Sequence, residues 1–158
     1  MPIISNLVFQ AVRWVARKGL SEDDQDASSE ARKKEARQTG IRGKAYAYWY
    51  LRRHGYVFVA RNYSPRRVKG EIDLVGCDGP TLAFVEVRTR TLRDNLPALP
   101  ELSVTPGKQH LLVRTAHRFL AERRVLECPC RFDVLAIDNS PGHPPVVRLH
   151  KDAFSPEM

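Results

Sequence analysis

Two short stretches of the chain decide its fold: GEIDLV at residues 70–75 and FVEVRTR at residues 84–90. Each alternates apolar and polar residues, as expected for a strand with one buried face. Side chains alternate along a strand, so Glu71 and Asp73 are expected to share one face, opposite that of Ile72 and Leu74. In the second stretch, Glu86, Arg88 and Arg90 share a face, and the valines between them point to a core. Both strands therefore present charged groups beside apolar ones.

The sequence CDGP at residues 77–80 joins the two stretches and predicts a hairpin. If the hairpin closes at the central Asp-Gly pair, Glu71 lies opposite Glu86. Asp73 then lies opposite Phe84 and diagonal to Glu86. Opposed Cβ atoms are about 5 Å apart and diagonal ones roughly 7 Å, so three carboxylates would crowd one patch. Hard oxygen ligands suit Mg²⁺ or Mn²⁺, and such an ion would offset the repulsion.

The cations beside these carboxylates permit two interpretations. A bound metal ion would lower the pKa of its water and stabilise charge on a phosphate, and Arg88 would hold a phosphate oxygen. Alternatively, Arg88 and Arg90 neutralise Glu71 and Glu86 in a surface ion-pair network, with no metal. The pattern alone leaves both interpretations open.

The surrounding segments complete an α/β domain in the order αβββαββ, with a central mixed sheet flanked by helices. The first helix has a face formed by Ala47, Tyr50, Leu51 and His54 and ends at Gly55. Strands are expected at 56–60, 71–75, 82–88, 132–137 and 146–149, with a basic loop at 61–70. A second helix begins at Thr105 and Pro106, which suit the N-cap and first helical positions, and it buries Leu112, Ala116, Phe119 and Leu120.

We divide the chain into residues 1–39, a domain at 40–150 and a tail at 151–158. An amphipathic helix is expected near the start, as a peripheral helix or a contact for a membrane surface or partner. The charged residues 21–39 form a solvated helix or a disordered linker.

The chain has no run of about 18 apolar residues and no signal-peptide pattern, which favours the cytoplasm. Three cysteines cannot all pair within the chain, and their spacing does not suit zinc.

The net charge of +8 is uneven along the chain. Residues 1–40 hold seven Lys/Arg and six Asp/Glu, whereas residues 41–158 hold nineteen and twelve. The excess of positive charge therefore lies on the domain, and it suits a phosphate-rich partner such as nucleic acid. A soluble basic protein without such a partner is the alternative.

Taken together, residues 70–75, residues 84–90 and RFDV at 131–134 resemble the YraN-like family of uncharacterised bacterial proteins. The resemblance extends to Arg61-Asn62 and to TPGKQ at 105–109, and it covers about residues 40–138. That family is similar to archaeal Holliday junction resolvases, within the restriction-endonuclease-like superfamily whose signature is PD-(D/E)-x-K. The resemblance implies this fold and a metal-dependent nuclease site.

The resemblance also implies roles for individual residues. Asp73 matches the signature aspartate and Glu86 the second acidic ligand, with the Val87 carbonyl as a third oxygen. Glu71 would bind metal or position water. Lys108 would meet DNA phosphate or be an ordinary surface lysine, and Asp133 would be structural, beside Arg131.

Two positions depart from the pattern. The last signature position is usually lysine but here is Arg88, which cannot act as a general base near neutral pH. A glutamate near the start of the family helix is replaced by Lys44. Both changes weaken the case for catalysis and leave nucleic-acid binding intact.

The leading hypothesis is an Mg²⁺-dependent endonuclease acting on structured or branched DNA, possible as a homodimer. The residues expected to contact nucleic acid are Lys44, Arg61, Arg66, Arg67, Lys69, Arg90 and Lys108. Tyr46, Trp49 and Tyr63 would stack on bases or belong to the core. One rival is a degenerate nuclease that binds nucleic acid without cutting it. The other is an adaptor that docks a protein through its N-terminal helix.

Overall fold

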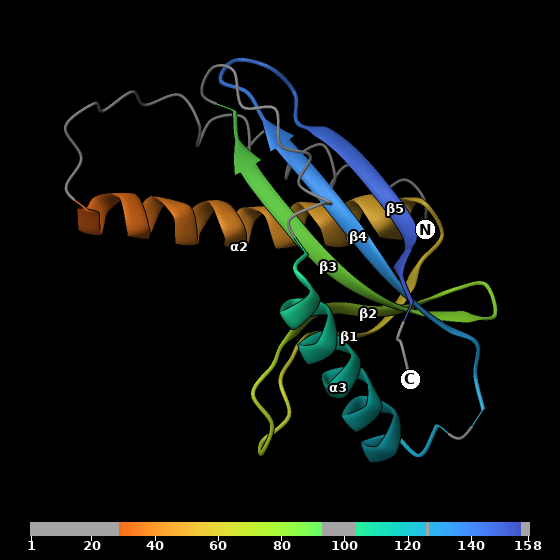
Figure 1. The fold of residues 1–158 in the computed structure, drawn as a ribbon. Helices are drawn as coiled ribbons and strands as arrows, with labels where there is room; N and C mark the ends of the chain where they lie inside the picture. The colour runs from red at the N-terminus through yellow and green to blue at the C-terminus, as the bar shows by residue number, and fades with distance from the viewer. Residues whose placement is uncertain (1–28, 93–103, 126, 156–158) are drawn as a thin grey trace.

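A computed structural model describes residues 29–92, 104–125 and 127–155. The element order is α2 (Ser29–Arg53), β1 (Val57–Tyr63), β2 (Ile72–Asp78), β3 (Thr81–Thr91), α3 (Pro106–Glu122), β4 (Cys130–Asn139) and β5 (Val146–Phe154) (Figure 1). The predicted α/β class and the order αβββαββ are confirmed, and the architecture is consistent with a nuclease-like fold. Within the described residues, no helix is both long and apolar enough to cross a membrane.

The five strands form one mixed sheet in the order β1-β2-β3-β4-β5. β3 and β4 pair in parallel, and every other neighbouring pair is antiparallel. A parallel pair requires a crossover, and the segment containing α3 supplies it. Because β3 and β4 lie at the centre, most of their residues are buried.

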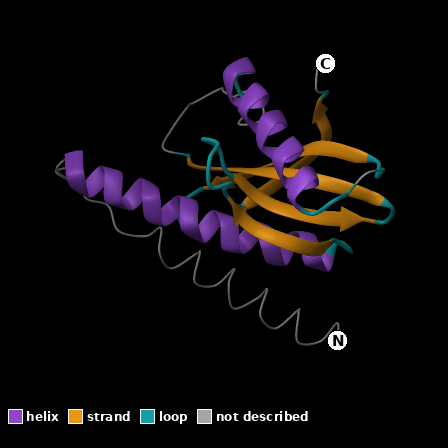
Figure 2. Cartoon of the chain, turned by 90° about the horizontal axis from the view of Figure 1, so that it is seen from below, coloured by secondary structure: helices purple, strands orange, loops and turns teal. Residues whose placement is uncertain are grey.

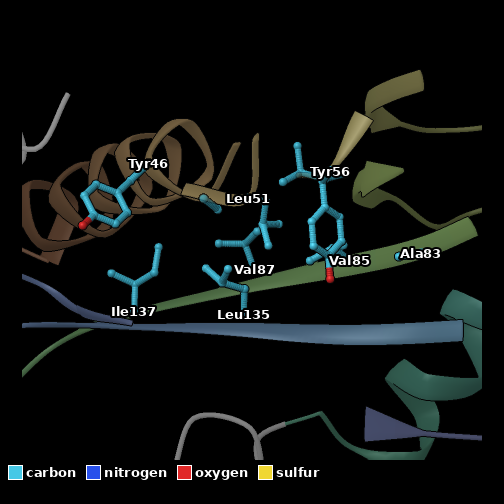
Figure 3. Close-up of a cluster of buried hydrophobic side chains, with 10 residues drawn as sticks. Tyr46, Leu51, Tyr56, Ala83, Val85, Val87, Leu135 and Ile137 are labelled. Atoms are coloured by element: carbon cyan, nitrogen blue, oxygen red, sulfur yellow. The ribbon is translucent and has the colours of Figure 1, made fainter. Parts of the chain in front are cut away.

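The two helices cover opposite faces of the sheet, as Figure 2 shows. On the α2 face, Tyr46, Ala47 and Leu51 pack on apolar residues of β3 and β4 (Figure 3). On the α3 face, Leu112, Ala116 and Phe119 pack on a second buried cluster. Figure 1 shows the first turns of α2 extending beyond the strands, where residues 29–38 are exposed.

Most predicted helix features are confirmed. Thr105 caps α3 by accepting a hydrogen bond from the Lys108 backbone N–H, and the predicted core face holds, with Leu120 half-buried. Gly55, at φ 92°, follows the end of α2. On the predicted face of the first helix, His54 is exposed, and Tyr46 is buried instead.

Several predicted boundaries need correction, among them those of α2, β1 and β5. α2 begins at Ser29, so the solvated-helix alternative holds for residues 29–39, and the helix continues through residue 40. β1 runs to Tyr63, which shortens the predicted basic loop, and β5 runs to Phe154 into the predicted tail. The N-terminal amphipathic helix falls outside the described residues. The three cysteines are unpaired.

Candidate functional site

The site forms where β2 and β3 separate. The strands pair from Asp78↔Thr81 to Leu74↔Val85, with the turn at Gly79-Pro80. The predicted register is therefore wrong: each β2 residue pairs with the β3 residue two positions beyond its predicted partner. Continuing the observed register places Asp73 directly opposite Glu86. There the Val87 backbone N–H donates to Asp73 Oδ2 at 2.8 Å. The aspartate side chain thus accepts from a backbone N–H at the point where the ladder ends.

This irregularity also changes which apolar residues share a face. Ile72 packs in the cluster beneath α3, whereas Leu74 packs in the cluster beneath α2. The prediction that they share a face is therefore wrong. Asp73 and Glu86 are buried at 6% and 5% exposure, so their carboxylates need compensation from nearby groups.

Lys44 supplies that compensation from α2. Its Nζ lies 2.6 Å from Glu71 Oε1, 2.7 Å from Asp73 Oδ1 and 3.4 Å from Asn62 Oδ1. Burial lowers the pKa of Lys44, but the hydrogen bonds and charges of Asp73 and Glu71 outweigh burial and raise it above the ordinary lysine value. Lys44 is therefore held as a cation between two carboxylates.

Two glycines let the backbone approach closely enough for this contact. A Cβ at Gly43 would overlap the Thr89 hydroxyl, so a larger residue there would separate α2 from β3. A Cβ at Gly70 would overlap the Thr115 hydroxyl of α3, and Gly70 also has a φ of 146°. Each glycine directly precedes a charged residue of the site.

Glu86 is neutralised from the other side of the sheet. Its Oε1 lies 3.3 Å from Lys108 Nζ, near the start of α3, and 3.5 Å from Arg88 Nε. The Arg88 contact is an ion pair without hydrogen-bond geometry, because Arg88 Nε has no hydrogen-bond partner within the described part of the chain. Burial, followed by repulsion from Asp73, raises the pKa of Glu86 above its ordinary value despite these cations. Glu86 Oε2 is buried and has no hydrogen-bond partner among the residues that the structure describes.

The structure thus brings together Asp73, Glu86, Glu71, Arg88, Lys44 and Lys108. Among the described residues, no group of three or more His, Cys, Asp or Glu side chains is placed to hold a metal ion. The Mg²⁺ or Mn²⁺ site stays a prediction. The alternative of an ion-pair network is present in altered form, with Lys44 rather than Arg90 on Glu71.

Other predicted contact residues lie in two different settings. Arg61, Arg66, Arg67 and Lys69 are exposed on β1 and the loop that leads to the site. By contrast, Arg90 Nε donates to the buried Asp138 at 2.7 Å, and Arg148 donates to the same carboxylate at 2.8 Å. These two arginines keep the pKa of Asp138 below its usual value, against the effect of burial. Arg90 therefore points into a structural network.

The aromatic residues expected at the site also divide. Tyr46 is buried at 4%, so its proposed base stacking is wrong and its core alternative holds. The Tyr63 hydroxyl donates to Glu122 at 2.7 Å, and its ring contacts Phe119. Trp49 is half-buried, with its ring edge-on to Tyr48.

Asp133 has the structural role expected of it. Arg131 donates to both of its oxygens, at 2.8 and 3.2 Å. The Tyr56 hydroxyl donates to the same carboxylate at 3.1 Å.

Sequence reasoning missed Tyr48 and Arg52. Tyr48 lies between Trp49 and Arg61, and Arg52 donates to its hydroxyl at 3.1 Å. Their spacing from Lys44, four and eight residues along α2, was a visible signal that all three share one side of the helix.

Comparison with known proteins shows the family to which the chain belongs. The model of the uncharacterised protein family UPF0102 matches residues 43–137, which include both hairpin strands and Lys44. The chain belongs to the UPF0102 family. This membership confirms the YraN-like resemblance.

Three UPF0102 relatives illustrate the extent of similarity. A UPF0102 protein of Geotalea uraniireducens is 41% identical over 115 residues, covering 73% of this chain and 87% of the relative. One of Koribacter versatilis is 41% identical over 118 residues, covering 74% and 79%. One of Symbiobacterium thermophilum is 40% identical over 119 residues, covering 75% and 98%.

Proposed function

We propose that this UPF0102 protein binds DNA through a nuclease-like domain and does not cleave it. The observation that carries the proposal is the position of Lys44 Nζ, within 2.7 Å of both Glu71 and Asp73 oxygens. An ammonium group there provides the positive charge that two neighbouring carboxylates require. It also occupies the space beside the oxygens that a metal ion would need.

The residues in this arrangement do not fit a magnesium ion. Mg²⁺ requires near-octahedral oxygen coordination and is usually bound by one or more carboxylates. Here Asp73 Oδ1 contacts Lys44, and Asp73 Oδ2 accepts from the Val87 N–H. Both oxygens of the signature aspartate already have partners.

The charge balance of the site points the same way. Three carboxylates, Glu71, Asp73 and Glu86, are matched by three cations, Lys44, Arg88 and Lys108. A site with no net negative charge has little attraction for a divalent cation. An arginine side chain cannot serve as a general base near neutral pH, so Arg88 cannot supply one.

The remaining charge supports binding to a polyanion. The chain carries a formal charge of +8. The loop that precedes Glu71 exposes Arg66, Arg67 and Lys69. Basic groups that neutralise phosphates provide most of the affinity in sequence-independent nucleic-acid binding.

A second candidate function is an Mg²⁺-dependent endonuclease acting on structured or branched DNA. One observation favours it: Glu86 Oε2 is buried without a hydrogen-bond partner from residues 29–92, 104–125 or 127–155, and burial raises the pKa of Glu86. A buried acceptor of this kind is costly and is common at functional sites. The predicted homodimer belongs with this candidate and stays a prediction.

The two candidates are separated by measuring binding and cleavage on the same DNA. Labelled single-stranded, duplex and four-way-junction DNA would be incubated with protein in EDTA, Mg²⁺ or Mn²⁺. We expect binding in EDTA that weakens steeply with salt, and intact DNA under every condition. Cleavage that requires a metal and disappears in both Asp73→Ala and Glu86→Ala would overturn the proposal and establish the endonuclease. Absence of binding to all three DNAs at low salt would reject both.

A further inference from the structure

The positive charge of the chain is concentrated in one segment. Residues 36–70 contain nine Lys/Arg and no Asp or Glu. The remaining residues contain seventeen Lys/Arg and eighteen Asp/Glu, so they are close to neutral. The segment comprises most of α2, all of β1 and the loop before β2.

The fold places this segment along one side of the molecule. β1 is an edge strand of the sheet, and α2 packs beneath the sheet (Figures 1 and 2). The exposed basic residues of the segment are Arg37, Arg52, Arg53, Arg61, Arg66, Arg67 and Lys69. A single-sign surface of this kind attracts polyanions over a distance set by the salt concentration.

Tyr48 organises the centre of this surface. The guanidinium carbon of Arg61, on β1, lies 4.2 Å from the centroid of the Tyr48 ring. From the next turn of α2, Arg52 donates to the Tyr48 hydroxyl at 3.1 Å, and its guanidinium carbon lies 5.7 Å from the Trp49 ring. We call Tyr48, Arg52 and Arg61 the arginine–tyrosine cluster.

These two arginines differ from the cations of the acidic site. Lys44, Arg88 and Lys108 are each paired with a carboxylate, whereas within the described ranges neither Arg52 nor Arg61 forms an ion pair with an acid. Contact with Tyr48 restricts both side chains, so less conformational entropy is lost when they bind an anion. A stacked guanidinium still presents N–H donors at its edge, and these match phosphate oxygens.

The aromatic rings themselves are poorly placed to receive a base. The Tyr48 ring has Arg61 near it and packs against Phe58, with centroids 5.0 Å apart. Trp49 meets the Tyr48 ring edge-on. The groups presented to a ligand are therefore the arginine edges, which contact phosphate rather than base.

We propose that the arginine–tyrosine cluster is a binding site for the phosphodiester backbone of nucleic acid. This inference rests on the proposed function and assigns it a surface distinct from the acidic site. Binding there is independent of base sequence. It depends on Arg52 and Arg61, with Tyr48 as the residue that positions them.

The test compares two double variants and a matched single variant in the full chain. Arg52→Ala/Arg61→Ala removes the contacts, and Arg52→Lys/Arg61→Lys keeps the charge. Arg123→Ala removes a comparable arginine, 5.4 Å from the Phe119 ring on α3. Binding to a labelled mixed-sequence oligonucleotide would be followed by fluorescence anisotropy across a salt series, with thermal denaturation to confirm folding.

We expect the double alanine variant to lose roughly tenfold in affinity per arginine near 0.1 M salt, because log K changes by about 0.9 per log unit of salt for each phosphate contact. The slope of log K against log salt should fall by about two units. The lysine variant should retain the slope, and Arg123→Ala should match wild type.

Three results would overturn the inference. The first is a folded double alanine variant that binds like wild type. If Arg66→Ala/Arg67→Ala then reduces binding, the proposed function stands and only the surface is wrong; if wild type itself does not bind, the proposed function fails. The second is an equal loss in Arg123→Ala. The third is wild-type binding to anionic vesicles as tight as to the oligonucleotide at matched salt, which would indicate a membrane surface instead.

Discussion

Replacing Lys44 by glutamate tests directly whether its ammonium group takes the place of a metal ion. The change removes a cation that contacts Glu71 and Asp73 and adds a third carboxylate beside them. The side chain of Asp73 is only 8% exposed, and removing one partner of a buried ion pair costs about 3–5 kcal/mol. Glu71 is 46% exposed, so its pair contributes less than about 1 kcal/mol.

The Lys44 side chain is one-third exposed, so the cost of breaking its ion pair with Asp73 falls at the low end of that range. We therefore expect Lys44→Glu to lose about 3 kcal/mol of unfolding free energy in EDTA. The variant site would hold four carboxylates, Glu86 included, against two cations, so Mg²⁺ or Mn²⁺ should bind and restore stability. At a metal concentration one hundred times Kd, the gain is about 2.7 kcal/mol.

The assay is urea denaturation in EDTA and in excess Mg²⁺, followed by tryptophan fluorescence. Lys44→Gln separates the two effects, because it loses the cation and gains only a neutral amide oxygen, so metal should stabilise it less than it stabilises Lys44→Glu. Lys151→Glu is the matched control, since Lys151 Nζ also lies 2.7 Å from an aspartate, Asp78. The reasoning fails if Lys44→Glu is as stable as wild type in EDTA, or if metal stabilises it no more than Lys151→Glu.

Three further predictions follow from buried groups near the site. Glu86→Gln should be more stable than wild type at neutral pH and equally stable in acid, because the raised pKa of Glu86 means that its ionisation opposes folding as pH rises through that pKa. Thermal denaturation at several pH values measures this, and a stability difference that persists unchanged down to low pH would contradict it. Asp138→Asn should lower the free energy of unfolding by on the order of 2 kcal/mol near neutrality, and this difference from wild type should shrink as pH falls through the lowered pKa of Asp138. Chemical denaturation at several pH values measures the difference, and a value independent of pH would count against the ion pairs of Asp138 as its cause. Gly43→Ala should lower the free energy of unfolding by about 1–3 kcal/mol, since its Cβ would overlap Thr89. Gly40→Ala, whose Cβ would meet no atom of the described residues within 4 Å, serves as the control in thermal denaturation, and equal stability of the two variants would contradict the close approach.

Local sequence chemistry predicted the elements but not all of their pairings. The start of α3 could be read from Thr105 and Pro106, because capping depends on neighbouring residues only. The hairpin register could not, because Asp78 belongs to β2 and is held there by Arg131 and Lys151 from distant strands. Likewise, Tyr63 joins β1 through its pairing with Ile72 in β2, a contact that its own segment does not encode.

The candidate site was predicted only in part, because some of its contacts join segments that are distant in the sequence. Alternation along the strands identified Glu71, Asp73 and Glu86 as neighbours. Lys44 was visible as a change of charge at one position. Its contact with both carboxylates depends on how closely α2 approaches β3 at Gly43, which is a property of the assembled fold.

A counter-ion that is covalently part of the chain behaves differently from one drawn out of solution. Lys44 cannot be removed by chelators, diluted or exchanged for a competing ion, so its occupancy beside Asp73 does not follow the supply of divalent cations in the cell. The geometry at the junction of β2 and β3 would thus be maintained equally in metal-rich and metal-starved conditions, and its electrostatic state would change only when the lysine itself is moved or modified.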